Sequence, residues 1–158
     1  MSRHERKAYR PRPPFKIIEG LGTPAFERLN PYAQWVLNKF YSRFDGRNRS
    51  NLSLSYAEVS PVMSGVIFSR AIWELIGFGF LDVRRWGRLE RNASLYGLSD
   101  RWRRFCEPGS ETRLDKIAAQ LQEVENLKRQ KWPEGKKSEK RERIAALRHS
   151  LLKVQESS

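Results

Sequence analysis

The chain has few of the residues from which disulfide frameworks and metal sites are built. Its 158 residues include one cysteine, Cys106, and two histidines, His4 and His149, far apart in the sequence. A single cysteine cannot form an internal disulfide, and three scattered residues do not match the ligand spacing of a zinc site. We therefore expect no disulfide, no bound metal and no cofactor.

Long apolar runs and enzyme motifs are also lacking. The longest apolar run, near Ile76–Leu81, is much shorter than the roughly 20 residues that cross a bilayer. No apolar segment follows the charged start Met1–Lys7, so we expect no secretory signal and a cytoplasmic, nucleoid-associated protein. There is no glycine-rich phosphate loop, no paired histidine and carboxylate, and no nucleophile elbow. The sequence therefore does not predict an enzyme, and Cys106 is more typical of a structural cysteine.

Acidic residues are outnumbered by basic ones. The chain has 31 Lys and Arg residues and 18 Asp and Glu residues, which gives a net charge of +13. Such a chain attracts polyanions, and counterion release strengthens its binding to phosphate backbones. Ribosome-associated and membrane-surface proteins are basic as well. The charge therefore favours a nucleic-acid partner without choosing between DNA and RNA.

The composition divides the chain into three zones: 1–16, 17–110 and 111–158. The first is a basic arm interrupted by prolines, which deny it a helix. It is either a solubilising tail or a segment that lies along phosphates or in a minor groove. Its candidate DNA-contacting residues are Arg3, Arg6, Lys7, Arg10 and Arg12.

The second zone carries most of the aromatic residues and is expected to fold. Its expected elements are helices at 31–44, 55–59 and 64–76 and strands at 52–54, 80–83 and 93–98. Asn30 can cap the first helix, and a basic loop, 84–92, joins the last two strands. This order is typical of a winged helix-turn-helix, a mainly α fold with a small antiparallel β-wing. Such a domain presents a helix to the major groove and a flanking loop to the DNA backbone.

The helix 64–76 is the expected recognition helix, and its N-terminal half would meet base edges. The residues on its outward side are Ser64, Gly65, Ser69, Arg70 and Trp73. Arg70 can form a bidentate contact to guanine. Ser64 either contacts DNA or only caps the helix, and Trp73 either packs on the DNA or, as we favour, covers the edge of the domain.

The loop 84–92 holds four arginines in nine residues: Arg84, Arg85, Arg88 and Arg91. A solvated charged loop is the alternative to a DNA-contacting wing, but the position directly after the recognition helix favours the wing. Arg101, Arg103 and Arg104 are expected to extend the same basic face, and Asp100 to cap a short helix that contains Trp102.

The segment 68–75, Phe-Ser-Arg-Ala-Ile-Trp-Glu-Leu, followed by Gly79-Phe80-Leu81, is similar to the recognition helix and first wing strand of MarR-like regulators. The segment 94–102 resembles small winged-helix proteins of phages and plasmids that control replication or transcription. The resemblance covers 31–105 and implies a sequence-specific double-stranded DNA-binding regulator of a mobile element or bacterial genome. Trp73 departs from the pattern, because a charged residue is usual there. RNA binding or protein docking within a larger nucleoprotein assembly is the alternative.

The third zone is expected to form two helices with apolar stripes. These are Leu114, Ile117, Leu121 and Val124, and Ile144, Leu147, Leu151 and Val154. A capping box at 112–115 and a cap at Ser138 are expected to start the helices. Each stripe must be buried, either in a homodimer, which we favour, or in an intramolecular hairpin that turns at 132–135.

Overall fold

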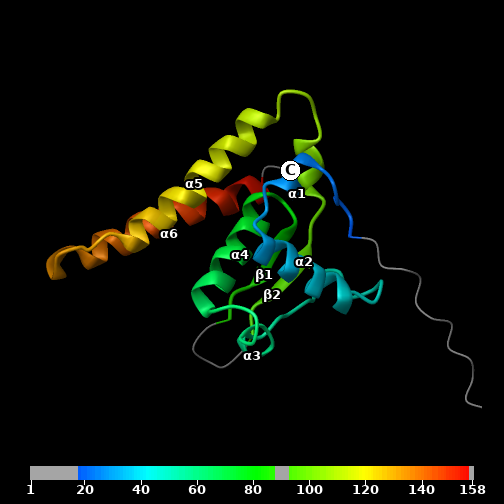
Figure 1. Cartoon of the computed structure of the whole chain (residues 1–158), viewed down its shortest axis with the longest axis horizontal. Coiled ribbons are helices and arrows are strands. Elements are labelled where there is room, and N and C mark those ends of the chain that lie inside the picture. The colour runs from blue at the N-terminus through cyan, green and yellow to red at the C-terminus, as the bar shows by residue number, and fades with distance from the viewer. Residues whose placement is uncertain (1–17, 88–92, 157–158) are drawn as a thin grey trace, which may run out of the picture.

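The computed structural model describes residues 18–87 and 93–156 (Figure 1). Its helices are α1 (Pro24–Glu27), α2 (Pro31–Arg43), α3 (Tyr56–Val59), α4 (Gly65–Gly77), α5 (Glu111–Arg129) and α6 (Lys137–Glu156). Two strands, β1 (Leu81–Arg85) and β2 (Leu95–Leu98), and two 3-10 turns, η1 (Arg101–Phe105) and η2 (Glu134–Lys136), complete it. The arm 1–16, Arg88 and Arg91 lie outside the described residues, as does the side chain of Val154.

Local capping explains where the helices of the central segment begin. Asn30 accepts a hydrogen bond from the backbone N–H of Ala33 at 2.9 Å and caps α2, as the sequence predicts. A capping box between Ser55 and Glu58 begins α3. Ser64 caps α4 by accepting from the N–H of Ile67 at 3.4 Å. The three expected helices of this segment are therefore confirmed.

The sheet is smaller than the sequence predicts. β1 and β2 pair antiparallel, with Leu81 opposite Leu98. The expected strand 52–54 is reduced to a single bridge, in which Leu52 and Tyr96 exchange two backbone hydrogen bonds of 2.9 and 2.7 Å. The chain leaves the sheet because Ser55 already caps α3. The fold class is confirmed as mainly helical with a small antiparallel sheet. The prediction of a full strand at 52–54 is wrong.

A tight turn joins α4 to β1. The N–H of Phe80 donates to the carbonyl of Leu75 at 2.8 Å, and the N–H of Gly79 to that of Ile76 at 3.2 Å. This pattern ends a helix with a residue of positive φ, and Gly79 has a φ of 83°. A β-carbon at Gly79 would lie 2.6 Å from the backbone nitrogen of Trp102. The turn therefore requires glycine and brings η1 against the end of α4.

The C-terminal helices form the intramolecular hairpin that was the alternative to a dimer. Figure 1 shows α5 and α6 side by side, projecting beyond the rest of the molecule. Leu114, Ile117 and Leu151 belong to the same buried cluster as α2 and α4. The hairpin and the second zone thus share one core. The described residues of the two stripes are all at least half-buried in the hairpin, so they give no reason to expect a homodimer.

Two expected caps are wrong, and a third lies at the expected position without its capping hydrogen bond. The first turn of α5 begins at Glu111, so the box at 112–115 lies inside the helix, and Asp115 instead pairs with Arg28 at 2.8 Å. Ser138 lies inside α6, because η2 leads directly into the helix at Lys137. Asp100 occupies the N-cap position of η1, as expected, but its side chain makes no capping hydrogen bond and pairs with Arg49 at 2.5 Å. Within the described ranges, every helix is too short or too polar to span a membrane.

Candidate nucleic-acid interface

The first turn of α4 is open to solvent. Ser64, Gly65 and Val66 are exposed, and Val66 has an exposed fraction of 66 %. A β-carbon at Gly65 would lie 3.5 Å from the ring of Tyr56 on α3, so the two helices approach closely here. Ser69, one turn further along, is half-buried. The part of α4 that a helix-turn-helix inserts into a groove is therefore accessible in this chain.

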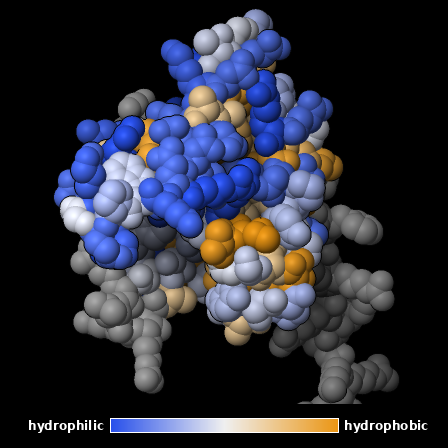
Figure 2. All heavy atoms as spheres, turned by 60° about the vertical axis from the view of Figure 1, so that its left-hand side comes forward, coloured by the Kyte–Doolittle hydropathy of each residue, from blue (hydrophilic) through white to orange (hydrophobic). Residues whose placement is uncertain are grey.

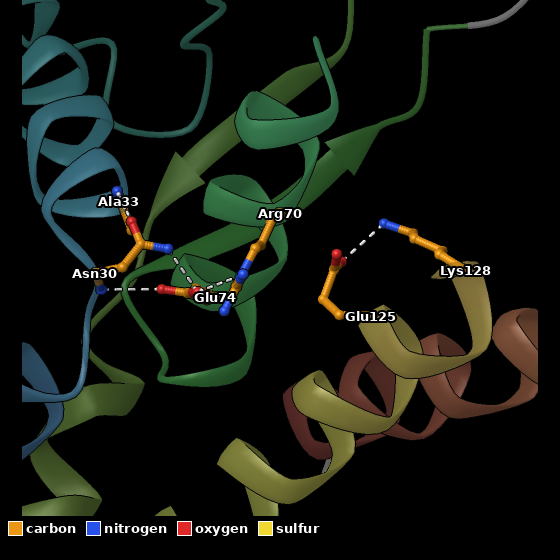
Figure 3. A network of polar contacts seen from close by, with 6 residues as sticks. All are labelled: Asn30, Ala33, Arg70, Glu74, Glu125 and Lys128. Carbon is orange, nitrogen blue, oxygen red and sulfur yellow. Dashed lines mark hydrogen bonds and ion pairs between the residues drawn. The ribbon is translucent and has the colours of Figure 1, made fainter. Parts of the chain in front are cut away.

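The middle of α4 is tied to α2 by a buried carboxylate (Figure 3). Glu74 is only 6 % exposed. Its carboxylate accepts hydrogen bonds from the backbone N–H of Asn30 at 3.0 Å and from Nδ2 of Asn30 at 2.7 Å. Nε of Arg70 donates to the same carboxylate at 3.2 Å. Asn30 thus caps α2 and holds α4 at once, and Arg70 already has an acidic partner.

Trp73 packs against two other parts of the chain. Its ring stacks on Trp86 at the end of β1, with 5.4 Å between ring centroids and 29° between ring planes. The guanidinium carbon of Arg148 on α6 lies 4.9 Å from the centroid of Trp73. These contacts agree with the packing interpretation of Trp73.

Arg84 and Arg85, at the far end of β1, are exposed. The N–H of Gly87 donates to Oγ of Ser94 at 2.8 Å and links the two sides of the loop. This bond joins the two sides of the hairpin next to these arginines, and the guanidinium of Arg84 lies over Gly97 of β2.

Arg101 was expected on the basic face, but it lies inside the molecule. Its side chain is 9 % exposed and pairs with Asp82 at 2.7 Å. It also donates to the carbonyls of Ile76 at 3.1 Å and Leu81 at 2.8 Å. Burial lowers the pKa of this guanidinium, although Asp82 opposes the shift. Arg101 therefore locks the α4–β1 turn and cannot contact DNA in this arrangement.

Arg103 and Arg104 are also separated from the loop. Leu98 pairs with Leu81 at the start of β1, so η1 follows at the opposite end of the strand from Arg85. η1 contacts α1 and α5, at the end of the molecule away from α3 (Figure 1). The guanidinium of Arg103 lies 5.3 Å from the ring centroid of Trp102. These arginines do not extend the surface formed by Arg84 and Arg85.

The C-terminal hairpin carries a basic stretch that was not among the expected contact residues. Between 128 and 148 the chain has nine basic residues and three acidic ones, Glu134, Glu139 and Glu142. The basic ones are Lys128, Arg129, Lys131, Lys136, Lys137, Lys140, Arg141, Arg143 and Arg148. The face shown in Figure 2 is largely hydrophilic, with a small hydrophobic group in its lower part. A count of charges along the third zone would have found this stretch.

The end of the hairpin is closed by Lys140. Its Nζ donates to the carbonyls of Lys128 at 2.9 Å and Gln130 at 2.8 Å, where α5 ends. A cation at this position satisfies carbonyls that have no partner within the helix. Lys140 therefore has a structural role within the basic stretch.

No family model, curated protein or solved structure matched the chain. Among the described residues, no group of three His, Cys, Asp or Glu could hold a metal ion, and Cys106 is an exposed free thiol. Function must therefore be argued from the geometry of the charged and aromatic side chains.

Proposed function

We propose that the chain is a winged helix-turn-helix protein that binds double-stranded DNA. The observation that carries this proposal is the exposed first turn of α4, presented by α3 and accompanied by exposed Arg84 and Arg85. The order α2, bridge, α3, α4, β1, β2 is the order of such domains. Control of transcription or replication in a mobile element or bacterial genome is the role that this activity would serve.

In the proposed complex, Ser64, Gly65 and Ser69 face the major groove and Arg84 and Arg85 contact phosphates. Arg70 can bond a guanine only if its guanidinium gives up the hydrogen bond to Glu74 and donates to the base instead. Its side chain is 39 % exposed, which leaves part of the guanidinium accessible for this exchange. Base choice would therefore depend on Arg70, and general affinity on the two loop arginines.

Fluorescence anisotropy with labelled duplex DNA over a salt series tests this proposal. Arg85→Ala should weaken binding to all duplexes alike and reduce the salt slope by about 0.9, the value for one lost phosphate contact. The matched control is Arg103→Ala, which removes the same charge at the other end of the molecule and should leave the slope unchanged. Equal effects of both variants would mean that only net charge matters and would contradict the proposal.

Protein docking is the second candidate, because the same surface is partly apolar. Val62 and Val66, beside Tyr56, are among the exposed large hydrophobic residues of the described chain. Exposed apolar groups that lie together are typical of protein-binding surfaces. If the full chain bound no duplex even at low salt, this candidate would replace DNA binding at α4.

A further inference from the structure

A surface cavity of about 530 Å³, open to solvent, lies where α4, the residue after β1, α5 and α6 meet. Its polar and aromatic lining comprises Trp73, Trp86, Lys128, Arg141, Arg148 and His149. Small-molecule sites in proteins have volumes of roughly 300–1,000 Å³ and combine an apolar wall with a few polar groups. The cavity has both the size and the mixed lining of such a site, and it is separate from the first turn of α4.

One wall of the cavity is aromatic. Trp73 and Trp86 are stacked on each other, and Trp86 is 41 % exposed. An exposed indole face is a platform on which a nucleobase can stack, because every base has a π-face. Trp86 lines the cavity and is exposed enough to offer such a platform.

The other wall is cationic and incompletely bonded. Nε of Arg148 is buried and has no hydrogen-bond partner among the described residues. Burial lowers the pKa of this guanidinium, and nearby Glu125 opposes the shift. Lys128 is bonded to Glu125 at 2.9 Å, so those two charges largely compensate each other. Arg148 and Arg141 both line the cavity, and an anionic ligand there would supply acceptors for the terminal nitrogens of their guanidinium groups.

We propose that this cavity binds a nucleoside phosphate, with its base on the indole of Trp86 and its phosphate at Arg148 and Arg141. A purely anionic ligand would leave the aromatic wall unused, and a neutral aromatic ligand would leave the guanidinium groups without acceptors. The ligand is either a free mononucleotide or an unpaired nucleotide within a strand. The inference does not depend on duplex binding by α4.

Quenching of tryptophan fluorescence in the full chain tests the proposal. The titrants are adenosine monophosphate, a short oligothymidylate, ribose 5-phosphate and a glutamate-rich peptide. We expect a nucleotide or the oligonucleotide to quench saturably. Trp86→Leu and Arg141→Met should each weaken that binding about tenfold, since stacking and arginine–phosphate contacts are of that strength.

Two control variants match these changes outside the cavity. Trp35→Leu removes an indole on α2 that lies under Lys39, and Arg143→Met removes an exposed charge on α6, two residues from Arg141. Neither residue lines the cavity. Both controls should bind the nucleotide as the unchanged protein does, and weakening by the controls equal to that by the cavity variants would overturn the proposal.

The titrants separate the two sources of ligand. Quenching by the mononucleotide supports a free nucleotide, and quenching by the oligonucleotide alone supports an unpaired nucleotide of a strand. No quenching at millimolar concentrations, or binding of ribose 5-phosphate or the peptide as tight as that of the nucleotides, would overturn the proposal. A blunt-ended duplex, which has no unpaired nucleotide, reports separately on α4, and Trp86→Leu should leave its salt slope unchanged.

Discussion

Glu74 belongs to α4 and Arg148 of α6 packs against that helix, and the two charged groups differ in how completely they are bonded. Glu74 accepts three hydrogen bonds, two of them from Asn30. The guanidinium of Arg148 lies over Trp73, and no described residue accepts a hydrogen bond from its buried Nε. A buried charge with all its partners holds a fold together, whereas a guanidinium that lines a cavity and is incompletely bonded can bind an anionic ligand there. The comparison therefore separates a structural junction from a candidate binding site.

Removal of the Glu74 carboxylate should have the largest effect. We expect Glu74→Ala to lower the free energy of unfolding by about 3 kcal/mol, because both hydrogen-bonding groups of Asn30 and the guanidinium of Arg70 lose their acceptor. Urea denaturation followed by circular dichroism measures this. Arg70→Met is the control, since its half-exposed ion pair is worth roughly 0.5 kcal/mol or less. Equal losses in the two variants would show that Glu74 is not the centre of the junction.

Truncation of Asn30 should have an intermediate effect. Asn30→Ala removes the N-cap of α2 and one of the two bonds to Glu74 but keeps the backbone N–H donor. We expect a loss of about 1–2 kcal/mol, as for other N-cap truncations. Measured with Glu74→Ala in a double-mutant cycle, the two changes should be clearly non-additive. Additive losses would mean that the cap and the junction are independent.

Replacement of Arg148 should have the smallest effect on stability. Arg148→Met removes an incompletely bonded, half-buried charge and keeps an apolar stem against Trp73. We expect the free energy of unfolding to change by less than about 1 kcal/mol, because an apolar side chain can replace such a charge at little cost. The same denaturation experiment measures it. A loss comparable to that of Glu74→Ala would assign Arg148 a structural role and remove the contrast.

Elements governed by neighbouring residues could be predicted from the sequence. Caps three residues from their partners, as at Asn30, and apolar residues three and four apart were enough to place α2, α3 and α4. The sequence also indicated the hairpin of α5 and α6, although only as the alternative to a dimer. These features depend on local geometry, which a linear pattern records.

Features that depend on distant residues could not be predicted. The bond between Asn30 and Glu74 spans 44 residues. The inward direction of Arg101 follows from the tight turn at Gly79, and the cavity exists only because α6 returns to Trp73 and Trp86. The candidate nucleotide site therefore had no signature in the spacing of its residues, beyond an excess of basic residues on the hairpin.

The contact of the hairpin with α4 also determines when the core can be completed during synthesis. Gly77 lies against the side chains of Ile117, Leu121 and Leu151, the nearest of which would be 3.0 Å from an added β-carbon. Chains are made from the N-terminus and domains fold as units. The part of α4 that faces the hairpin thus stays incompletely covered on the ribosome until Leu151 has emerged. Because α4 is synthesised well before Leu151, this apolar surface is exposed for that interval, and chaperones can bind to it.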